Sequence, residues 1–251
     1  MIKLAKLNNR PEIFHSIQGE GVNLGIPSVF VRLSLCNLYC IWCDTDYTWN
    51  WEGTVYPHNN DALPGYTKFK KEDYVLALPN DEIIANIAAF NCPNIVITGG
   101  EPLVQRKDLE PLLRELKAKD PGYHIEFETN GTIAPHAALD QYSDQYNVSV
   151  KLSNSAVAYA DRIVPEALAF FARSEKSNFK FVVDQESDLR EILALKEEFG
   201  ITAGKILLMP QGTKASALKA KEQWLVDICK AYNFRYTDRL HIRIFGDKRG
   251  V

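Results

Sequence analysis

Short apolar runs alternate with longer amphipathic segments along most of the chain. Runs typical of β-strands lie at residues 28–35, 94–98, 124–128, 147–150, 179–183 and 205–209, and a last one lies at 240–244. Between them, apolar residues recur at helical spacing in segments that include residues 83–87, 109–116, 189–195 and 218–228, with Asn80 as a candidate helix cap. This alternation predicts an α/β fold with right-handed crossovers.

The number of strand–helix units narrows the architecture. About six units can be counted, too few for an eightfold barrel, so we expect an open or partial barrel. Residues 50–79 interrupt the alternation, because they are polar, aromatic and rich in turn residues. We interpret them as an insertion that replaces the first crossover helix and as a candidate lid. No repeat or linker divides the chain, so residues 1–251 are expected to form one domain.

Composition and charge exclude several classes of protein. The chain is 46% hydrophobic and 24% charged, as is usual for a globular domain, and its formal charge of -3 offers no case for binding nucleic acid or membrane. The N-terminus lacks the apolar run of a signal peptide, and the cysteines number five. We therefore expect reduced thiols and a cytoplasmic location. Cys92 and Cys229 stand alone and are interpreted as ordinary core or surface thiols.

Three cysteines are clustered directly after the first predicted strand. Cys36, Cys40 and Cys43 have the spacing C-x3-C-x2-C. A zinc site would need a fourth ligand, and no second cysteine pair or spaced histidine pair follows. An iron–sulfur cluster held by three thiolates would leave one iron open to a small molecule. Thiols that cluster without binding anything are the remaining alternative.

With Trp42 in the last spacer, this pattern resembles the signature of the radical S-adenosylmethionine (SAM) superfamily. G-G-E-P at residues 99–102, after the next strand, resembles the second motif of that superfamily. The resemblance implies a partial (β/α)6 barrel of the radical SAM type. It also implies a [4Fe-4S] cluster on the three cysteines and SAM bound at the unique iron, with G-G-E-P holding the amino group of the methionine moiety.

Further motifs narrow the resemblance from the superfamily to one family within it. The segments 12–21 (E-I-F-H-S-I-Q-G-E-G), 43–46 (C-D-T-D), 128–131 (E-T-N-G) and 246–251 (G-D-K-R-G-V) resemble the 7-carboxy-7-deazaguanine synthases. The resemblance implies a carbon–nitrogen lyase that converts 6-carboxy-tetrahydropterin to 7-carboxy-7-deazaguanine with loss of ammonia, in queuosine and 7-deazapurine biosynthesis. It further implies a requirement for Mg²⁺, a homodimer, and flavodoxin or ferredoxin as the reductant.

The resemblance also assigns residues to each ligand, and no catalytic side chain beyond the chemistry of the cofactor. Cofactor contacts are implied for Trp42, Cys43, Asp44, Gly99, Gly100, Glu101, Glu128, Asn130, Ser149, Val150, Lys151, Met209, Pro210, Gln211 and Gly212. Substrate contacts are implied for Ile17, Gln18, Gly19, Glu20, Arg32, Thr98 and Val251. The metal ligands are Cys36, Cys40 and Cys43 for the cluster and Thr45 for Mg²⁺. S-V-K at 149–151 and M-P-Q at 209–211 stand where the family usually has S-P-K and Q-P.

The chemistry of several of these residues suits a flat heterocycle that carries a carboxylate. Glu20 offers two acceptors to an amidine-like N–H edge, and Gln18 can donate and accept in the same plane. Arg32 can bind a carboxylate through two nitrogens. One threonine hydroxyl suits Mg²⁺, which keeps much of its water, although Asp44 and Thr45 could also simply cap a turn.

Two other readings of the chain remain open. A glycyl-radical-enzyme activating enzyme would share C-x3-C-x2-C but would give no reason for Q-G-E-G or C-D-T-D. A non-enzymatic module with a structural metal or an iron–sulfur cluster would be expected to use four ligands rather than three. The roles of His15 and His241 are ambiguous; His241 falls in the strand predicted at 240–244, where a structural histidine is the simpler interpretation.

Overall fold

The computed structural model describes residues 1–251 and contains one mixed, eleven-stranded sheet. Six strands run parallel in the order in which the chain makes them, and the short β11 (Arg235–Tyr236) extends them at the β10 edge. The six are β4 (Pro27–Leu33), β6 (Asn94–Gly99), β7 (His124–Thr129), β8 (Gln145–Val148), β9 (Ser177–Val183) and β10 (Ile206–Pro210). The sheet ends in β11 on one side and β2 on the other, and these do not pair. The predicted partial barrel is therefore confirmed.

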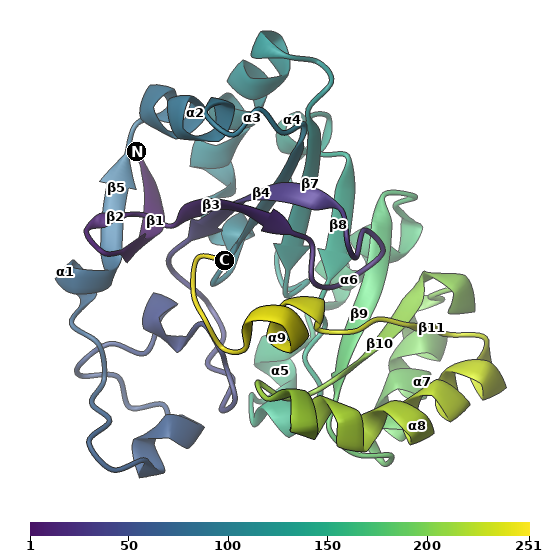
Figure 1. Ribbon diagram of the computed structural model, residues 1–251. Coiled ribbons are helices and arrows are strands. Elements are labelled where there is room, and N and C mark those ends of the chain that lie inside the picture. The colour runs from purple at the N-terminus through teal and green to yellow at the C-terminus, as the bar shows by residue number, and fades with distance from the viewer.

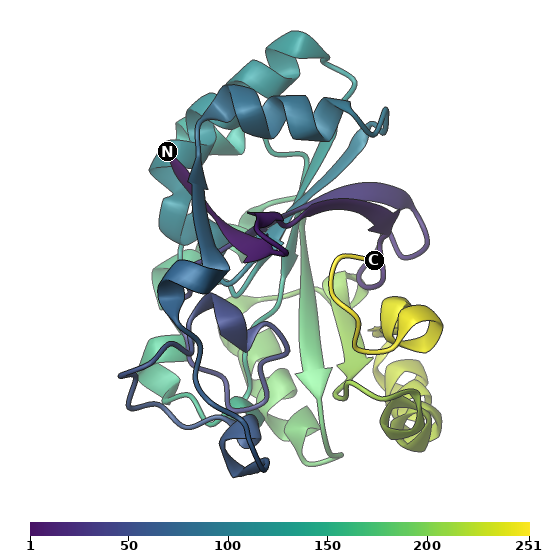
Figure 2. The same cartoon turned by 60° about the vertical axis from the view of Figure 1, so that its left-hand side comes forward.

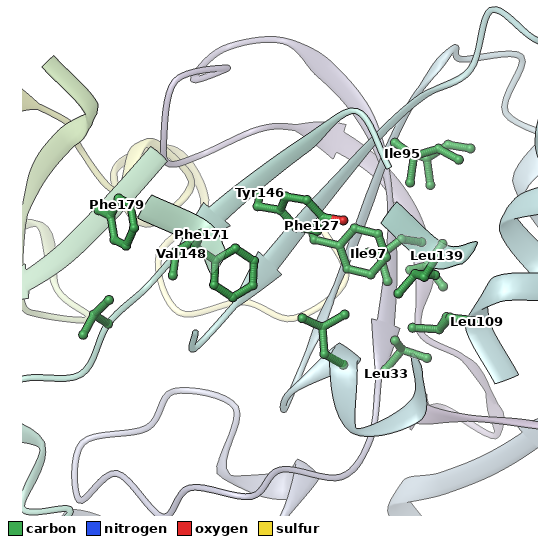
Figure 3. Packing of buried hydrophobic residues seen from close by; sticks show 14 of the residues in the cluster. Leu33, Ile95, Ile97, Leu109, Phe127, Leu139, Tyr146, Val148, Phe171 and Phe179 are labelled. Atoms are coloured by element: carbon green, nitrogen blue, oxygen red, sulfur yellow. The ribbon is translucent and has the colours of Figure 1, made fainter. Parts of the chain in front are cut away.

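Helices pack against the outer face of this sheet (Figure 1). The longer ones are α2 (Asn80–Ala88), α3 (Arg106–Lys119), α6 (Pro165–Arg173), α7 (Asp188–Phe199) and α8 (Ala215–Tyr232); α4 (Ala137–Asp140) and α5 (Tyr159–Arg162) are single turns. A cluster of 37 buried residues fills the space between helices and sheet. Leu109 of α3, Phe127 of β7 and Phe171 of α6 belong to this core (Figure 3). None of the helices is both long and apolar enough to cross a lipid bilayer.

The pleat of the strands separates this apolar core from a polar barrel interior. Successive side chains of a strand point to opposite faces. In β9, Phe181 packs in the core, whereas Lys180 faces the interior. In β7, Phe127 packs in the core, whereas Glu126 and Glu128 take the other face. The same strands that build the core therefore carry charged groups into the barrel.

Four N-terminal and crossover strands were not predicted. They are β1 (Ile2–Leu7), β2 (Arg10–Pro11), β3 (Ile13–Ile17) and β5 (Val75–Leu78), all antiparallel to their partners. β3 pairs with β4 in a register that runs from Ile13 opposite Val31 to Ile17 opposite Pro27. This pairing brings the segment that follows β3 to the barrel opening. In Figure 2 the β3–β4 hairpin lies beside the C-terminus.

The structure corrects two details of the sequence prediction. Residues 240–244 are not a strand but lie in α9 (Leu240–Phe245). The period of so short an apolar run does not distinguish a strand from a helix. The segment 50–79 contains α1 (Lys71–Tyr74) and β5, and α2 follows it before β6. This crossover therefore keeps a helix, with Pro79 rather than Asn80 at its N-cap.

The glycines of G-G-E-P allow β6 to end against the cysteine loop. Gly99 has φ +132°, and a Cβ there would lie 2.0 Å from the carbonyl oxygen of Leu33. A Cβ on Gly100 would lie 2.1 Å from the carbonyl oxygen of Leu35. Neither neighbour is a movable side-chain tip, because both atoms belong to the backbone. Only glycine fits this close approach.

We expect Gly99→Ala to lower the free energy of unfolding by at least about 2 kcal/mol, because the methyl group meets backbone in a conformation that L-residues avoid. Gly204→Ala is the matched control, since nothing lies within 4 Å of a Cβ there. Its effect should stay within about 0.5 kcal/mol. Urea unfolding followed by circular dichroism measures both values. Equal stabilities for the two variants would contradict the packing argument.

Candidate active site

A cavity opens at the carboxyl ends of the parallel strands, between the N-terminal segment, the cysteine loop and the C-terminal tail. Most residues assigned from the sequence meet there. Those that line it are Ile17, Gln18, Gly19, Glu20, Arg32, Trp42, Asp44, Thr45, Thr98, Gly99, Gly100, Glu128, Asn130, Ser149, Met209, Gln211, Gly212 and Val251. The fold thus brings the segment after β3, the C-terminal tail and the ends of several parallel strands to one place.

The other assigned residues are not among those that line the cavity. They are Cys36, Cys40, Cys43, Glu101, Val150, Lys151 and Pro210. The side chain of Glu101 is fully buried and accepts hydrogen bonds from Leu103 N (2.9 Å), Thr129 Oγ1 (2.8 Å) and Asn130 N (2.6 Å). Its carboxylate is therefore already occupied by the protein, and it organises the turns around the cavity.

The three cysteines of the loop are free thiols. Burial raises the pKa of Cys40 to about 12 and also raises those of Cys36 and Cys43. A single zinc ion would need its ligands drawn together at about 2.3 Å from the metal. No three His, Cys, Asp or Glu side chains converge in that way. Three thiols on one loop are instead the type of donor set that an iron–sulfur cluster uses.

Two carboxylates of the cavity share one lysine. Lys180 Nζ donates to Glu20 Oε2 at 2.5 Å and to Glu128 Oε2 at 2.7 Å, and its side chain is only 4% exposed. Burial alone would raise the pKa of Glu20, but the charges of Lys180 and Arg239 hold it well below its usual range. Glu20 is therefore ionised and fixed in place at the cavity wall.

Arg239 joins three loops around the cavity opening. Its Nε donates to Glu20 Oε1 at 3.0 Å and one Nη to the carbonyl oxygen of Gly212 at 2.7 Å. The other Nη donates to Asp44, whose pKa it lowers against the effect of burial. One guanidinium thus fastens the cysteine loop to the N-terminal segment and to the end of β10.

The barrel floor holds a second carboxylate network. Glu126 accepts hydrogen bonds from Gln18 Nε2, from Asn23 Nδ2 at 2.6 Å and from Asn147 Nδ2 at 2.7 Å. Burial and the nearby charge of Glu128 raise the pKa of Glu126 to about 7. Because the Gln18 nitrogen is held by Glu126, the orientation of its amide is set before any ligand binds.

The C-terminal tail is anchored beside Arg32. Glu12 is buried and accepts from Arg32 Nε at 3.1 Å and from an Nη of Arg249 at 2.6 Å. The Arg249 guanidinium also lies 3.4 Å from the ring centroid of Tyr47. These contacts place the tail at the cavity, where Val251 contributes to the lining.

The two ambiguous histidines lie in different surroundings. His241, in α9, lines the cavity, and its Nε2 is 3.5 Å from an Nη of Arg239. Burial lowers its pKa, and a Cβ on Gly19 would lie 2.1 Å from its Nδ1, so Gly19 makes room for the ring. His15 is exposed on β3 near Phe90 and does not line the cavity.

The segment 50–79 contributes no residue to the cavity lining. It contacts the cysteine loop instead: Asn59 N donates to the carbonyl oxygen of Ile41 at 2.8 Å, and His58 Nε2 lies 2.9 Å from that of Cys43. In this structure the segment therefore lies behind the loop rather than over the opening.

Sequence reasoning missed Lys180, Glu126 and Arg239. The sequence does indicate that Lys180 is special, because a lysine inside the apolar run F-K-F-V-V needs a buried partner. The alternation in H-I-E-F-E-T likewise indicated one polar strand face. Arg239 carried no signal, since its partners come from three distant loops.

Lys180→Met should lower the free energy of unfolding by about 3–5 kcal/mol near pH 7, because it leaves buried carboxylates without their cation. Lys176→Met is the control, since Lys176 is 3.5 Å from Asp140 at a more exposed site and should cost under about 1 kcal/mol. Denaturant titration measures both.

The pH dependence separates charge from packing. The lowered pKa of Glu20 contributes stability above its ordinary value of 4.5 and loses it as the pH falls below that value. The gap between wild type and Lys180→Met should therefore shrink below about pH 4.5. A gap that stays constant between pH 7 and pH 3 would contradict the role of the ion pairs.

Comparison with known proteins agrees with this geometry. The family profile of the Radical SAM superfamily matches residues 31–168. The 7-carboxy-7-deazaguanine synthase of Pyrobaculum aerophilum is 37% identical over 95% of this chain and 95% of its own. Those of Halobacterium salinarum (34%, covering 94% and 90%) and Rhodopirellula baltica (33%, covering 96% and 87%) are also similar.

A solved structure shows the same fold. The crystal structure of QueE from Escherichia coli superposes with a TM-score of 0.64 at 26% identity, covering 95% of both chains. The matching superfamily profile spans the cysteine loop and the G-G-E-P turn, and the relatives span nearly the whole chain. The chain therefore belongs to the 7-carboxy-7-deazaguanine synthase family of radical SAM enzymes.

Proposed function

We propose that this chain is itself a 7-carboxy-7-deazaguanine synthase. It would convert 6-carboxy-tetrahydropterin to 7-carboxy-7-deazaguanine with loss of ammonia, in a Mg²⁺-dependent reaction on the route to queuosine and other 7-deazapurines. One observation carries the proposal: residues that the family resemblance assigns to substrate, to SAM and to Mg²⁺ line a single cavity, next to the cysteine loop.

The cysteine loop and the glycine turn would hold the cofactors. Cys36, Cys40 and Cys43 would bind three irons of a [4Fe-4S] cluster, which the radical SAM family implies together with SAM. When bound, this pair supplies a 5′-deoxyadenosyl radical that removes hydrogen from the substrate. Gly99 and Gly100 line the cavity without side chains and leave backbone groups accessible to the methionine moiety.

The substrate would be recognised by groups whose charge and orientation are already set. Glu20 is kept ionised by Lys180 and Arg239, so it can accept N–H groups from the amidine edge of a pterin. The Nε of Arg32 is taken by Glu12, which leaves the Nη groups for the substrate carboxylate. Rigid partners of this kind reduce the entropic cost of binding.

Thr45 is the cavity group best placed to bind Mg²⁺. Its neighbour Asp44 is engaged by Arg239, whereas the hydrogen-bond contact of the Thr45 hydroxyl is with the sulfur of Cys43, at 3.5 Å. One protein oxygen, completed by the substrate and by water, suits an ion that gives up water reluctantly. The tail from Gly246 to Val251 would then help to exclude bulk solvent from the cavity.

The proposal extends to the surroundings of the enzyme. We expect a homodimer in the cytoplasm that is reduced by flavodoxin or ferredoxin, with no nucleic acid or membrane as a partner. These expectations rest on the family resemblance and on the charge of -3.

The decisive experiment is anaerobic reconstitution with iron and sulfide, followed by incubation with SAM, Mg²⁺, a reductant and 6-carboxy-tetrahydropterin. Mass spectrometry should detect 7-carboxy-7-deazaguanine and 5′-deoxyadenosine. Cleavage of SAM without the deazaguanine product would reject the substrate assignment while leaving the superfamily assignment intact.

Cys36→Ala should reduce the iron bound after reconstitution to below about a tenth of the wild-type value, because two thiolates hold a cluster poorly. The matched control is Cys92→Ala, which removes a buried thiol that bonds to the carbonyl oxygen of Pro27 far from the loop. Iron and sulfide are assayed chemically, and the visible absorbance of the brown cluster is recorded for each protein. Full iron content in Cys36→Ala would refute the cluster assignment.

Thr45→Val should weaken the activation by Mg²⁺ at least about tenfold, because it removes a ligand oxygen at nearly constant volume. Thr45→Ser keeps the hydroxyl and should retain most of the response. Product formation is measured as a function of Mg²⁺ concentration for the three proteins. Superimposable Mg²⁺ curves for wild type and Thr45→Val would remove Thr45 from the metal site.

A further inference from the structure

The segment 50–79 holds the cysteine loop at two carbonyl groups that are two residues apart. Asn59 N donates to the carbonyl oxygen of Ile41 at 2.8 Å, and the His58 ring bonds to that of Cys43 at 2.9 Å. We propose that His58 is a positioning residue that keeps the cysteine loop in its cluster-binding shape, which makes this segment a support rather than a lid. The inference rests on the proposed function only in that the loop binds an iron–sulfur cluster.

The hydrogen bonds of His58 settle which nitrogen carries the proton. Nδ1 accepts from Asn60 N at 3.2 Å, so Nε2 carries the hydrogen that is donated to Cys43. The backbone N of His58 in turn donates to Asp61 Oδ2 at 2.9 Å, which completes a capping box. The side chain is only 2% exposed and is held at both ring nitrogens.

A second anchor lies just after the loop. Asp46 is buried and accepts from Tyr66 Oη at 2.8 Å and from Asn60 Nδ2 at 3.3 Å. Its carboxylate lies 3.4 Å from His58 Nδ1 but forms no hydrogen bond with it, because that nitrogen accepts from Asn60 N. The residues that hold Asp46 and those that hold Cys43 therefore belong to the same short segment, so the loop is fixed before and after Thr45.

The opposite side of the loop is held by the segment after β8. Ile41 N donates to the carbonyl oxygen of Ser155 at 2.9 Å, and Trp42 Nε1 donates to that of Asn154 at 2.8 Å. The loop thus lies between two segments that are both hydrogen-bonded to its backbone or side chains: residues 58–59 and residues 154–155. A loop ordered in advance loses less conformational entropy when a ligand binds, so these bonds favour retention of the cluster.

The two ring nitrogens of His58 can be tested separately. Asparagine places its amide near Nδ1 and is a good N-cap, so His58→Asn keeps the cap but does not reach Cys43. Glutamine reaches the position of Nε2, so His58→Gln keeps the bond to Cys43. His136→Asn is the matched control, because His136 Nδ1 accepts from Leu139 N at 3.2 Å as the cap of α4, away from the loop.

Two measurements read the effect without any assay of turnover. Amide hydrogen exchange of peptides covering residues 36–48 reports the order of the loop in the protein before reconstitution. The rate of iron loss to a chelator, with the electron paramagnetic resonance spectrum of the reduced cluster, reports its retention. His58→Asn should raise the exchange rate of the loop and the rate of iron loss about tenfold each, because it removes one hydrogen bond to a buried carbonyl group. His58→Gln and His136→Asn should stay near wild type.

The outcomes separate this inference from the proposed function. A wild-type protein that binds no iron would contradict the proposed function. Hydrogen exchange in residues 36–48 would still test whether His58 orders the cysteine loop. Wild-type exchange and iron loss in His58→Asn would overturn the role of His58. Rates in His58→Gln as high as in His58→Asn would overturn the role of the Nε2 bond. If His58→Asn fails to fold, the comparison of His58→Gln with His136→Asn remains. Faster loop exchange and faster iron loss in His58→Gln would then overturn the role of the Nε2 bond.

Discussion

A lysine in the middle of an apolar strand must be paired, and this constraint links the barrel to the site. Lys180 enters the interior because the pleat of β9 puts its neighbours in the core. Its two partners, Glu20 and Glu128, come from the N-terminal segment and from β7. The pairing therefore draws the segment after β3 onto the strand ends and keeps Glu20 ionised at the cavity wall.

The same group of charges links segments across the open side of the barrel. A six-unit barrel leaves one side uncovered, and Arg239 bridges this side by binding Glu20, Asp44 and the backbone of Gly212. Since Asp44 follows the last cysteine of the loop, this contact couples the cysteine loop to the Glu20 side of the cavity. The site is thus assembled by a few buried ion pairs rather than by one secondary-structure element.

The cysteine loop shows how polar segments around the barrel support the site. Its front faces the glycine turn, where a side chain on Gly100 would collide with the backbone of Leu35. Its back rests on His58, which belongs to the segment 50–79. These bonds hold the backbone of a loop that belongs to no helix or strand.

The sequence by itself determined the six parallel strands, the core face of their helices and the motifs at the strand ends, because these depend on local periodicity and spacing. Only the tertiary structure decided that 240–244 is a helix, that residues 50–79 lie behind the loop, and that Lys180, Glu126 and Arg239 belong to the site. These features depend on partners far apart in the chain. A buried charge shows in the sequence that it needs a partner, but only the folded chain determines which residue that partner is.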